Sequence, residues 1–151
     1  ENLKNIYTHL HTIIAIGTTS LRTLESLYWS LPPIPSPKGG FEVLKVKQFQ
    51  PYQTPKNQLP SVKAVLEDWL AFMDKHNLAE ITGETEIFIM PGYEFKICKG
   101  LITNYHLPET TLVLLVAAFV GEDWRKIYDQ ALQNNYRFLS YGDSSLLLPE
   151  K

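Results

Sequence analysis

The sequence predicts an α/β fold, a layered sheet with packed helices in a single domain. Two apolar runs, residues 13–16 and 87–90, have the length and composition of buried strands. The first run passes through Gly17 into apolar residues at helical spacing, the strand-turn-helix order of α/β proteins. The chain has 151 residues, 44% of them hydrophobic and 20% charged, which is enough to form one core.

The N-terminal third contains a helix, a strand and a second helix. Residues 1–12 place apolar side chains at helical spacing, and residues 13–16 then form the predicted buried strand, which ends at Gly17. The hydroxyls of residues 18–20 can cap the N-terminus of a helix that runs to about Trp29.

The middle of the chain begins as a loop. Prolines within residues 32–37 exclude regular structure, and residues 41–49 allow a short strand. Ser61 is then expected to cap an amphipathic helix that extends to about Met73.

The sheet is completed in the second half. The strand at 87–90 is stopped by Pro91, and residues 95–97 and 101–102 suggest further short strands. A final strand and turn are expected at 138–148.

Two more helices are expected between these strands. Pro108 and Glu109 suit a first helical turn, and the apolar run that follows predicts a buried helix that ends at Gly121. Residues 123–135 predict another helix. Its inward side chains should be Trp124, Ile127, Tyr128, Ala131 and Leu132.

Composition excludes several classes of protein. The net charge of −2 argues against a strongly basic nucleic-acid module. The single Cys98 excludes internal disulfides, iron-sulfur clusters and zinc ribbons. The longest apolar run, residues 112–120, is too short to span a bilayer, so we expect a cytoplasmic protein without membrane association. The chain opens without an initiator methionine, so we expect it to be a piece of a longer protein.

Basic and acidic residues are separated along the chain. Residues 36–63 contain five lysines and one glutamate, and residues 64–95 contain seven acids and one lysine. The basic segment is either a solvated loop or a surface for phosphates. The lysines that would contact phosphates include Lys38, Lys45, Lys47 and Lys56.

A first candidate site is the turn between the first strand and the second helix. Backbone N–H groups at a helix N-terminus favour an anion or carboxylate. The residues are Gly17, Thr18, Thr19, Ser20 and Arg22. Simple N-capping by the hydroxyls, and a surface ion pair from Arg22 to Glu25 or Glu1, are the alternatives. Conventional dinucleotide and P-loop motifs are absent from the sequence.

A second candidate lies at residues 103–108, where polar groups leave an apolar strand. His106 there is either an acid-base group or a core histidine satisfied by a backbone carbonyl. His9 and His11 have the spacing of metal ligands without a third ligand, so we expect no metal site.

The third candidate is the turn at residues 136–143, which brings together rings, a cation and a carboxylate. Such a group suits a cationic or planar ligand. The alternative is a capped turn with Tyr136 and Phe138 in the core. Asp143, Ser20 and His106 also supply the residue types of a hydrolase triad, but the G-x-S-x-G motif is missing.

Three blocks in this order resemble the C-terminal part of the S-adenosylmethionine:tRNA ribosyltransferase-isomerase family. The blocks are IIAIGTTSLRTLES (13–26), EIFIMPGYEFKICKGLITNYHLPETTLVLLVAAFVG (86–121) and YRFLSYGD (136–143). The resemblance implies a fragment of a two-domain enzyme whose β-barrel domain is absent. It also implies that residues from about 30 to 78 are an insertion, because the family has a shorter connection there.

The resemblance implies a reaction and its partners. The ribosyl part of S-adenosylmethionine would be transferred to 7-aminomethyl-7-deazaguanine at the tRNA wobble position and isomerised, giving epoxyqueuosine and releasing adenine and methionine. S-adenosylmethionine would be a co-substrate, no metal would be needed, and the protein would be a monomer. The fragment alone is expected to be inactive.

The resemblance also assigns roles to the matched residues. His106 would carry a proton, and Asp143 and Tyr141 would lie near the sulfonium or the aminomethyl cation. Carboxylate- or phosphate-binding positions would be Gly17, Thr18, Thr19, Ser20 and Arg22, and Asn104 would complete the substrate-binding set. Two competing functions are a non-catalytic tRNA-binding or scaffolding domain and a small-molecule hydrolase with Ser20 as nucleophile.

Overall fold

A computed structural model describes residues 1–30, 44–107 and 110–149, apart from the side chain of Tyr141. The helices are α1 (Asn2–Thr8), α2 (Thr18–Trp29), α3 (Val62–Lys75), α4 (Thr111–Val120) and α5 (Asp123–Gln133). The strands are β1 (Ile14–Ile16), β2 (Leu44–Val46), β3 (Gly83–Thr85), β4 (Gly100–Asn104) and β5 (Ser144–Leu147). Short 3₁₀ helices are η1 (Gln50–Tyr52), η2 (Lys56–Gln58) and η3 (Leu139–Tyr141).

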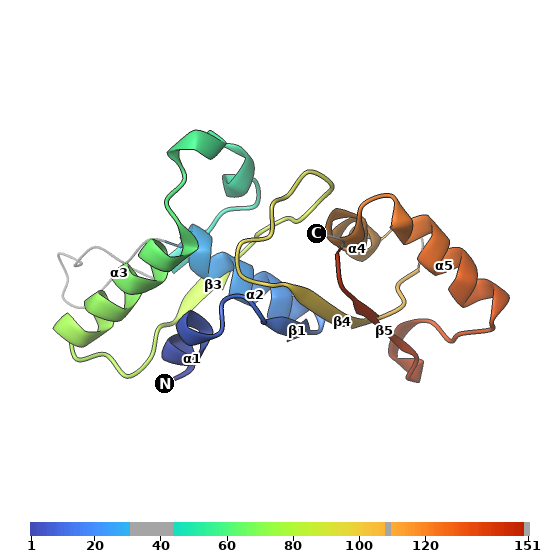
Figure 1. Ribbon diagram of the computed structural model, residues 1–151, viewed down its shortest axis with the longest axis horizontal. Coiled ribbons are helices and arrows are strands. Elements are labelled where there is room, and N and C mark those ends of the chain that lie inside the picture. Colours follow the sequence, from blue (N-terminus) through green and yellow to red (C-terminus); the bar gives the residue numbers. More distant parts are fainter. Residues whose placement is uncertain (31–43, 108–109, 150–151) are drawn as a thin grey trace.

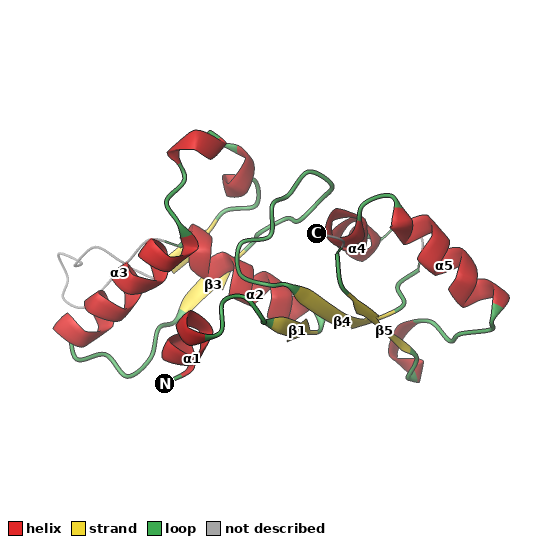
Figure 2. Cartoon of the chain, in the orientation of Figure 1, coloured by secondary structure: helices red, strands yellow, loops and turns green. Residues whose placement is uncertain are grey.

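The strands form two small sheets, and the predicted mixture of helices and sheet is confirmed (Figures 1 and 2). The larger sheet has the order β1-β4-β5. In it β1 runs parallel to β4, and β5 runs antiparallel to β4. The smaller sheet pairs β2 and β3 in parallel. Helices α1 and α3 lie toward one end of the molecule, and α4 and α5 lie toward the other (Figure 1).

The first strand is where it was predicted, but it is not buried on both sides. Ala15 is buried, whereas Ile14 and Ile16 are exposed. Strand β1 is an edge strand, and no described residues cover the outer face of its sheet. Side chains alternate between the two faces of a strand, so only every second side chain of β1 reaches the core.

The strand predicted at residues 87–90 is wrong in position. Strand β3 occupies Gly83–Thr85, and the chain then continues without regular structure. The apolar run is nevertheless core, because Ile87 and Ile89 are buried. Phe88 donates its backbone N–H to the carbonyl of Gln48, which holds the run beside the β2 segment.

The strand predicted at residues 95–97 does not form. The N–H groups of Lys96, Ile97 and Cys98 donate to the carboxylate of Glu25 instead of to a neighbouring strand. The Glu25 side chain of α2 therefore accepts the backbone hydrogen bonds that a neighbouring strand would otherwise accept.

Helix ends follow the sequence where capping residues determine them. Ser61 Oγ accepts the Ala64 N–H at 3.1 Å, and Gly121 ends α4 with φ +61°. Two burial expectations are wrong, because Leu114 of α4 and Leu132 of α5 are exposed.

Other boundaries shift. Helix α1 ends at Thr8, and β5 is confined to Ser144–Leu147 instead of 138–148. Expectations for Pro108, Glu109 and the prolines at 32–37 lie outside the described residues.

The described part of the expected insertion is integrated into the core. Trp69 of α3 is fully buried and donates its indole N–H to the Ser30 carbonyl at 3.3 Å. The hydroxyl of Tyr28 in α2 donates to the Pro60 carbonyl at 2.7 Å. Removal of this segment would therefore expose part of the surface of α2.

Candidate active site at the sheet edge

The three candidate stretches meet at one edge of the larger sheet. Strands β1 and β4 are parallel, so their carboxyl ends lie at the same edge, and antiparallel β5 begins there. The N–H of Gly17 donates to the Ile102 carbonyl at 2.8 Å, and Asn104 is in register with Ser144. The turn after β1, the end of β4 and the start of β5 thus form one region (Figure 1).

The turn at Gly17 does not use its hydroxyls as helix caps. Gly17 itself is the N-cap residue of α2, with φ +87°, and no side chain caps the helix. A side chain at Gly17 would be strained by this φ, although open space surrounds the position. Thr19 and Ser20 are exposed. The capping interpretation is wrong, and the hydroxyls are open at the positive end of a helix dipole.

Arg22 makes neither of the surface ion pairs considered for it. Its guanidinium donates to the backbone carbonyl of Ile87 at 2.5 Å, which connects α2 to the apolar run before Pro91. Glu25, the expected partner, points into the core. Arg22 keeps further N–H donors, because the guanidinium has five.

Glu25 is a structural residue that sequence reasoning missed. Its carboxylate is fully buried and accepts the N–H groups of Ile97 and Cys98 at 2.9 and 2.8 Å. Tyr93 donates its hydroxyl to the same carboxylate at 2.8 Å. The available signal was spacing, since Glu25 follows buried Leu21 by four residues and shares its helix face.

Burial and the Glu25 charge change the acidity of two neighbours. Desolvation, with the nearby carboxylate, raises the pKa of the Tyr93 hydroxyl and of the Cys98 thiol far above their usual ranges. Both groups stay protonated at neutral pH, so the structure gives Cys98 no nucleophilic role.

His106 follows β4 and is held by two side chains. Its Nε2 lies 3.0 Å from Thr103 Oγ1, and its backbone N–H donates to the Tyr128 hydroxyl at 3.2 Å. Burial lowers the pKa of the His106 imidazole. A neutral imidazole that is hydrogen-bonded to a hydroxyl can accept or relay a proton. The other interpretation, a core histidine satisfied by a backbone carbonyl, does not match this contact, because the ring bonds the Thr103 hydroxyl.

The Asp143 carboxylate is occupied by Arg137. The Arg137 guanidinium contacts both carboxylate oxygens at 3.2 Å and lowers the pKa of Asp143. Asn104 Nδ2 donates to the backbone carbonyl of Asp143 at 3.2 Å, so β4 supports this turn directly. The capped-turn alternative is half right: Phe138 is partly buried but Tyr136 is exposed. The side chain of Tyr141 lies outside the description.

The other chemical alternatives lack supporting contacts. His106 bonds Thr103 and Asp143 bonds Arg137, so the structure shows no Ser20 relay of the hydrolase kind. Within residues 1–30, 44–107 and 110–149, no group of three or more His, Cys, Asp or Glu could hold a metal ion.

Three lysines of the basic segment are paired with carboxylates, among them Lys63, which lies 3.9 Å from Glu67. Lys45 lies 3.1 Å from Glu86, and Lys56 lies 2.8 Å from Glu94. Lys38 is outside the described residues. The described lysines that form ion pairs would have to exchange these carboxylates for phosphates, which weakens the case for a tRNA-binding surface there.

The decisive comparison is with protein families. A family model described as "Queuosine biosynthesis protein" matches residues 1–147. This chain belongs to that family. Among the curated relatives, S-adenosylmethionine:tRNA ribosyltransferase-isomerase of Legionella pneumophila (strain Corby) is 61% identical over 137 residues, which are 90% of this chain and 27% of the relative. The enzyme of that name from Ruegeria pomeroyi is 56% identical over 73 residues, 48% of this chain and 21% of the relative.

A solved structure shows the same family fold. The crystal structure of S-adenosylmethionine tRNA ribosyltransferase from Thermotoga maritima matches with a TM-score of 0.58 and 31% identity, over 97% of this chain and 36% of the other. The resemblance drawn from the three blocks is thereby confirmed. The chain spans about a quarter of the length of the Legionella relatives that it matches. No described helix is long and apolar enough to cross a membrane.

Proposed function

We propose that this chain supplies part of the active site of an S-adenosylmethionine:tRNA ribosyltransferase-isomerase. The observation that carries the proposal is the convergence of the turn after β1, the end of β4 and the start of β5 at one sheet edge. The relatives with this enzyme name support the activity, and they are three to five times longer than the stretch they share with this chain.

The proposed reaction transfers the ribosyl part of S-adenosylmethionine to 7-aminomethyl-7-deazaguanine at the wobble position of tRNA. The sulfonium acidifies the adjacent 5′ carbon, so that a base can remove a proton and adenine can leave. The aminomethyl nitrogen then attacks the ribosyl carbon, and closure of the epoxide ring expels methionine, giving epoxyqueuosine. No step of this scheme uses a metal.

The anionic end of the substrate fits the turn at Gly17. Uncapped N–H groups and open hydroxyls of Thr18, Thr19 and Ser20 suit the methionyl carboxylate or a tRNA phosphate. Arg22 adds a cation one turn further along the same helix. Its bond to Ile87 holds the guanidinium in place, which favours a fixed geometry over a mobile surface charge.

His106 is the proposed proton carrier. The lowered pKa keeps the imidazole neutral near pH 7, as a base requires, and the buried Thr103 hydroxyl orients the ring. Asn104 positions the turn that carries Asp143.

Asp143 and Tyr141 are proposed to face the sulfonium or the aminomethyl cation. The Asp143 carboxylate is ionised but already paired with Arg137, so a substrate cation must share that carboxylate with the guanidinium. Such sharing is feasible because the pair is solvent-accessible and therefore weak.

We also infer that the protein is cytoplasmic and monomeric, and that residues from about 30 to 78 are a lineage-specific insertion. The 137-residue match to the Legionella relative is too long to omit this segment, so at least that relative shares it.

The test is mass spectrometry of tRNA containing 7-aminomethyl-7-deazaguanine after incubation with S-adenosylmethionine and the full-length protein that contains this stretch, with the 151-residue chain in parallel. We expect epoxyqueuosine and free adenine from the full-length protein only. If neither protein gives product while the tRNA is still bound, the non-catalytic binding function is correct instead.

A further inference from the structure

The segment that follows β4 is fixed in place around His106. The His106 backbone N–H donates to the Tyr128 hydroxyl at 3.2 Å, and the carbonyl of the preceding residue, Tyr105, accepts the Leu139 N–H at 2.8 Å. The imidazole itself contacts Thr103, whose Oγ1 lies 3.0 Å from Nε2. Neither the backbone nor the ring of His106 can therefore rotate without breaking a hydrogen bond.

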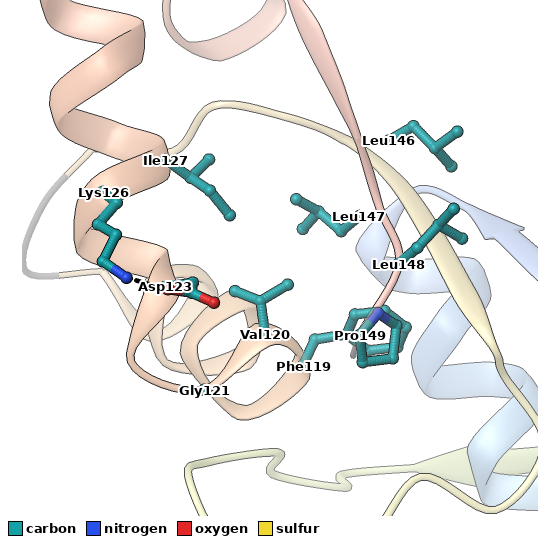
Figure 3. Close-up of a pocket in the computed structure, with 10 residues that line it drawn as sticks. All are labelled: Phe119, Val120, Gly121, Asp123, Lys126, Ile127, Leu146, Leu147, Leu148 and Pro149. Atoms are coloured by element: carbon teal, nitrogen blue, oxygen red, sulfur yellow. Dashed lines mark hydrogen bonds and ion pairs between the residues drawn. The ribbon is translucent and has the colours of Figure 1, made fainter. Parts of the chain in front are cut away.

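Helix α5 supplies one of these contacts through Tyr128. A cavity of about 580 Å³ lies between the start of α5, the end of α4 and the end of β5, and Ile127 and Leu147 point toward each other across it (Figure 3). The Tyr128 ring is buried and lies edge-on to Tyr105 and Phe138, with ring centroids 5.8 and 6.0 Å away. These aromatic contacts and the Tyr128 hydroxyl thus hold α5 against the segment after β4.

Thr103 lies on the buried side of β4. The residue is 5% exposed, and it is in register with Ser145 of β5. The Ser145 hydroxyl donates to the Thr103 carbonyl at 3.3 Å, so the backbone of Thr103 is fixed as well. Its hydroxyl, which contacts Nε2 of His106, therefore holds this ring nitrogen against the sheet.

The other ring nitrogen of His106, Nδ1, is open. Every buried polar side-chain atom in the described part of the chain has a hydrogen-bond partner. Nδ1 has no partner among the described residues, so it is not buried. Because β4 ends at the sheet edge that it shares with the Gly17 turn, Nδ1 is the ring nitrogen that a substrate at this edge can reach.

We infer that His106 exchanges its proton at Nδ1, and that Thr103 is the positioning residue that holds the ring by Nε2. The inference rests on the proposed function of His106 as the proton carrier. Nδ1 takes the proton from the 5′ carbon with its lone pair, and the carbon keeps the electron pair of the broken C–H bond beside the sulfonium. Nε2 carries a proton throughout this step.

A hydroxyl is suited to hold the ring in this way, because its oxygen accepts hydrogen bonds. A neutral ring with its lone pair on Nδ1 has its proton on Nε2, which donates to Thr103 Oγ1. The same bond persists once Nδ1 is protonated, and it is then stronger because the donor is charged. Thr103 therefore serves both the neutral base and the imidazolium that proton transfer produces, without any movement of the ring.

The first test compares variants of the full-length protein that contains this stretch. Thr103→Val removes the hydroxyl and keeps the shape, Thr103→Ser keeps the hydroxyl, and Ser145→Ala is the matched control that removes a neighbouring hydroxyl. We expect Thr103→Val to lower kcat at least about tenfold and to change KM for S-adenosylmethionine less than about threefold. The other two variants should keep kcat within about threefold. Equal losses of kcat in Thr103→Val and Thr103→Ser, or a change in KM alone, would overturn the inference.

The pH profile separates positioning of the ring from a general loss of structure. Burial lowers the pKa of His106, and no charged side chain in the described part of the chain contributes to that change. Loss of the Thr103 acceptor disfavours the imidazolium further, so the acidic limb of kcat/KM should move to lower pH by about 0.5 or more in Thr103→Val. Thr103→Ser should leave the limb in place. A reduced kcat with an unchanged limb in Thr103→Val would contradict the role of Thr103.

A second measurement does not depend on turnover. Nitrogen NMR of the full-length protein with isotope-labelled histidines identifies the protonated ring nitrogen, and the variant His106→Gln assigns the signal. We expect neutral His106 to carry its proton on Nε2, and a proton on Nδ1 would overturn the inference. A wild-type protein that forms no epoxyqueuosine would refute the proposed function, whereas the NMR result decides separately which ring nitrogen is free.

Discussion

The carboxylate of Glu25 lies 2.8 Å from the backbone nitrogen of Cys98, so a buried charge joins α2 to the segment that enters β4. The same helix begins at the Gly17 turn, and the same strand ends at His106. Glu25 therefore controls the relative placement of two parts of the candidate site without touching a substrate position.

Replacement of Glu25 by glutamine should destabilise the protein by about 3 kcal/mol. An amide has one acceptor oxygen, and its NH₂ group would face the N–H donors of the loop, leaving buried groups unsatisfied. Chemical denaturation measures the change. Exposed Glu80→Gln is the control and should change the free energy of unfolding by less than about 0.5 kcal/mol. A loss below about 1 kcal/mol for Glu25→Gln would contradict the structural role.

Cys98 should be unreactive in the native state. Its pKa is raised by burial and by the Glu25 charge, so very little thiolate is present. We expect a thiol reagent to label native protein at least about a hundredfold more slowly than protein in denaturant. Rapid native labelling would show that the segment at residues 96–98 opens readily.

The change His106→Ala in the full-length enzyme should reduce turnover by about a hundredfold or more, if the imidazole carries the proton. The affinities for tRNA and S-adenosylmethionine should change little. Exposed His11→Ala is the matched control and should retain full turnover. An effect on affinity alone would remove the proton-transfer role from His106.

The lowered pKa of His106 also predicts a pH dependence of stability. Unfolded histidine binds a proton below about pH 6.5, whereas the half-buried His106 of the folded protein remains neutral until its lower folded pKa is reached. Unfolded protein therefore binds more protons in that window, and stability falls as the pH decreases through it. The variant His106→Gln should lack this component when the two proteins are compared by denaturation between pH 5 and about pH 7.5.

Glu94 should titrate far below an ordinary glutamate. Hydrogen bonds from Lys56 and Lys96 lower its pKa to about 2. The ion pairs of Glu94 with the two lysines stabilise the folded protein above the unfolded pKa of about 4.3. This stabilisation is lost as the pH falls toward 2. Carboxyl NMR chemical shifts measure this directly, and Lys56→Ala should raise the value. A titration of Glu94 near pH 4.3 would show that the ion pairs do not persist in solution.

The sequence predicted the parts of this fold that depend on neighbouring residues. Ser61 caps its helix and Gly121 ends another, because capping requires only local hydrogen bonds or a positive φ. The turn at Gly17 lies between strand and helix as periodicity indicated.

Features that depend on distant residues were not predicted. The segment at 95–97 has a strand-like composition, but Glu25 from α2 takes its N–H groups. Burial of Ile14 and Ile16 depends on what covers the sheet, which local sequence does not encode. At the candidate site, the sequence predicted His106 as a functional residue. It did not predict the contact of His106 with Thr103, because that contact depends on how the chain turns after β4.

The parallel pairing of Ile14 with Gly100 also bears on how the protein folds. A contact between residues so far apart in sequence carries a large loop-closure entropy, which slows formation of the sheet. Strand β5 (Ser144–Leu147) is synthesised after β4, so it pairs with β4 later than β1 does. On a ribosome the Gly17 turn would therefore emerge long before its partners, and the substrate edge would be the last feature of this chain to assemble.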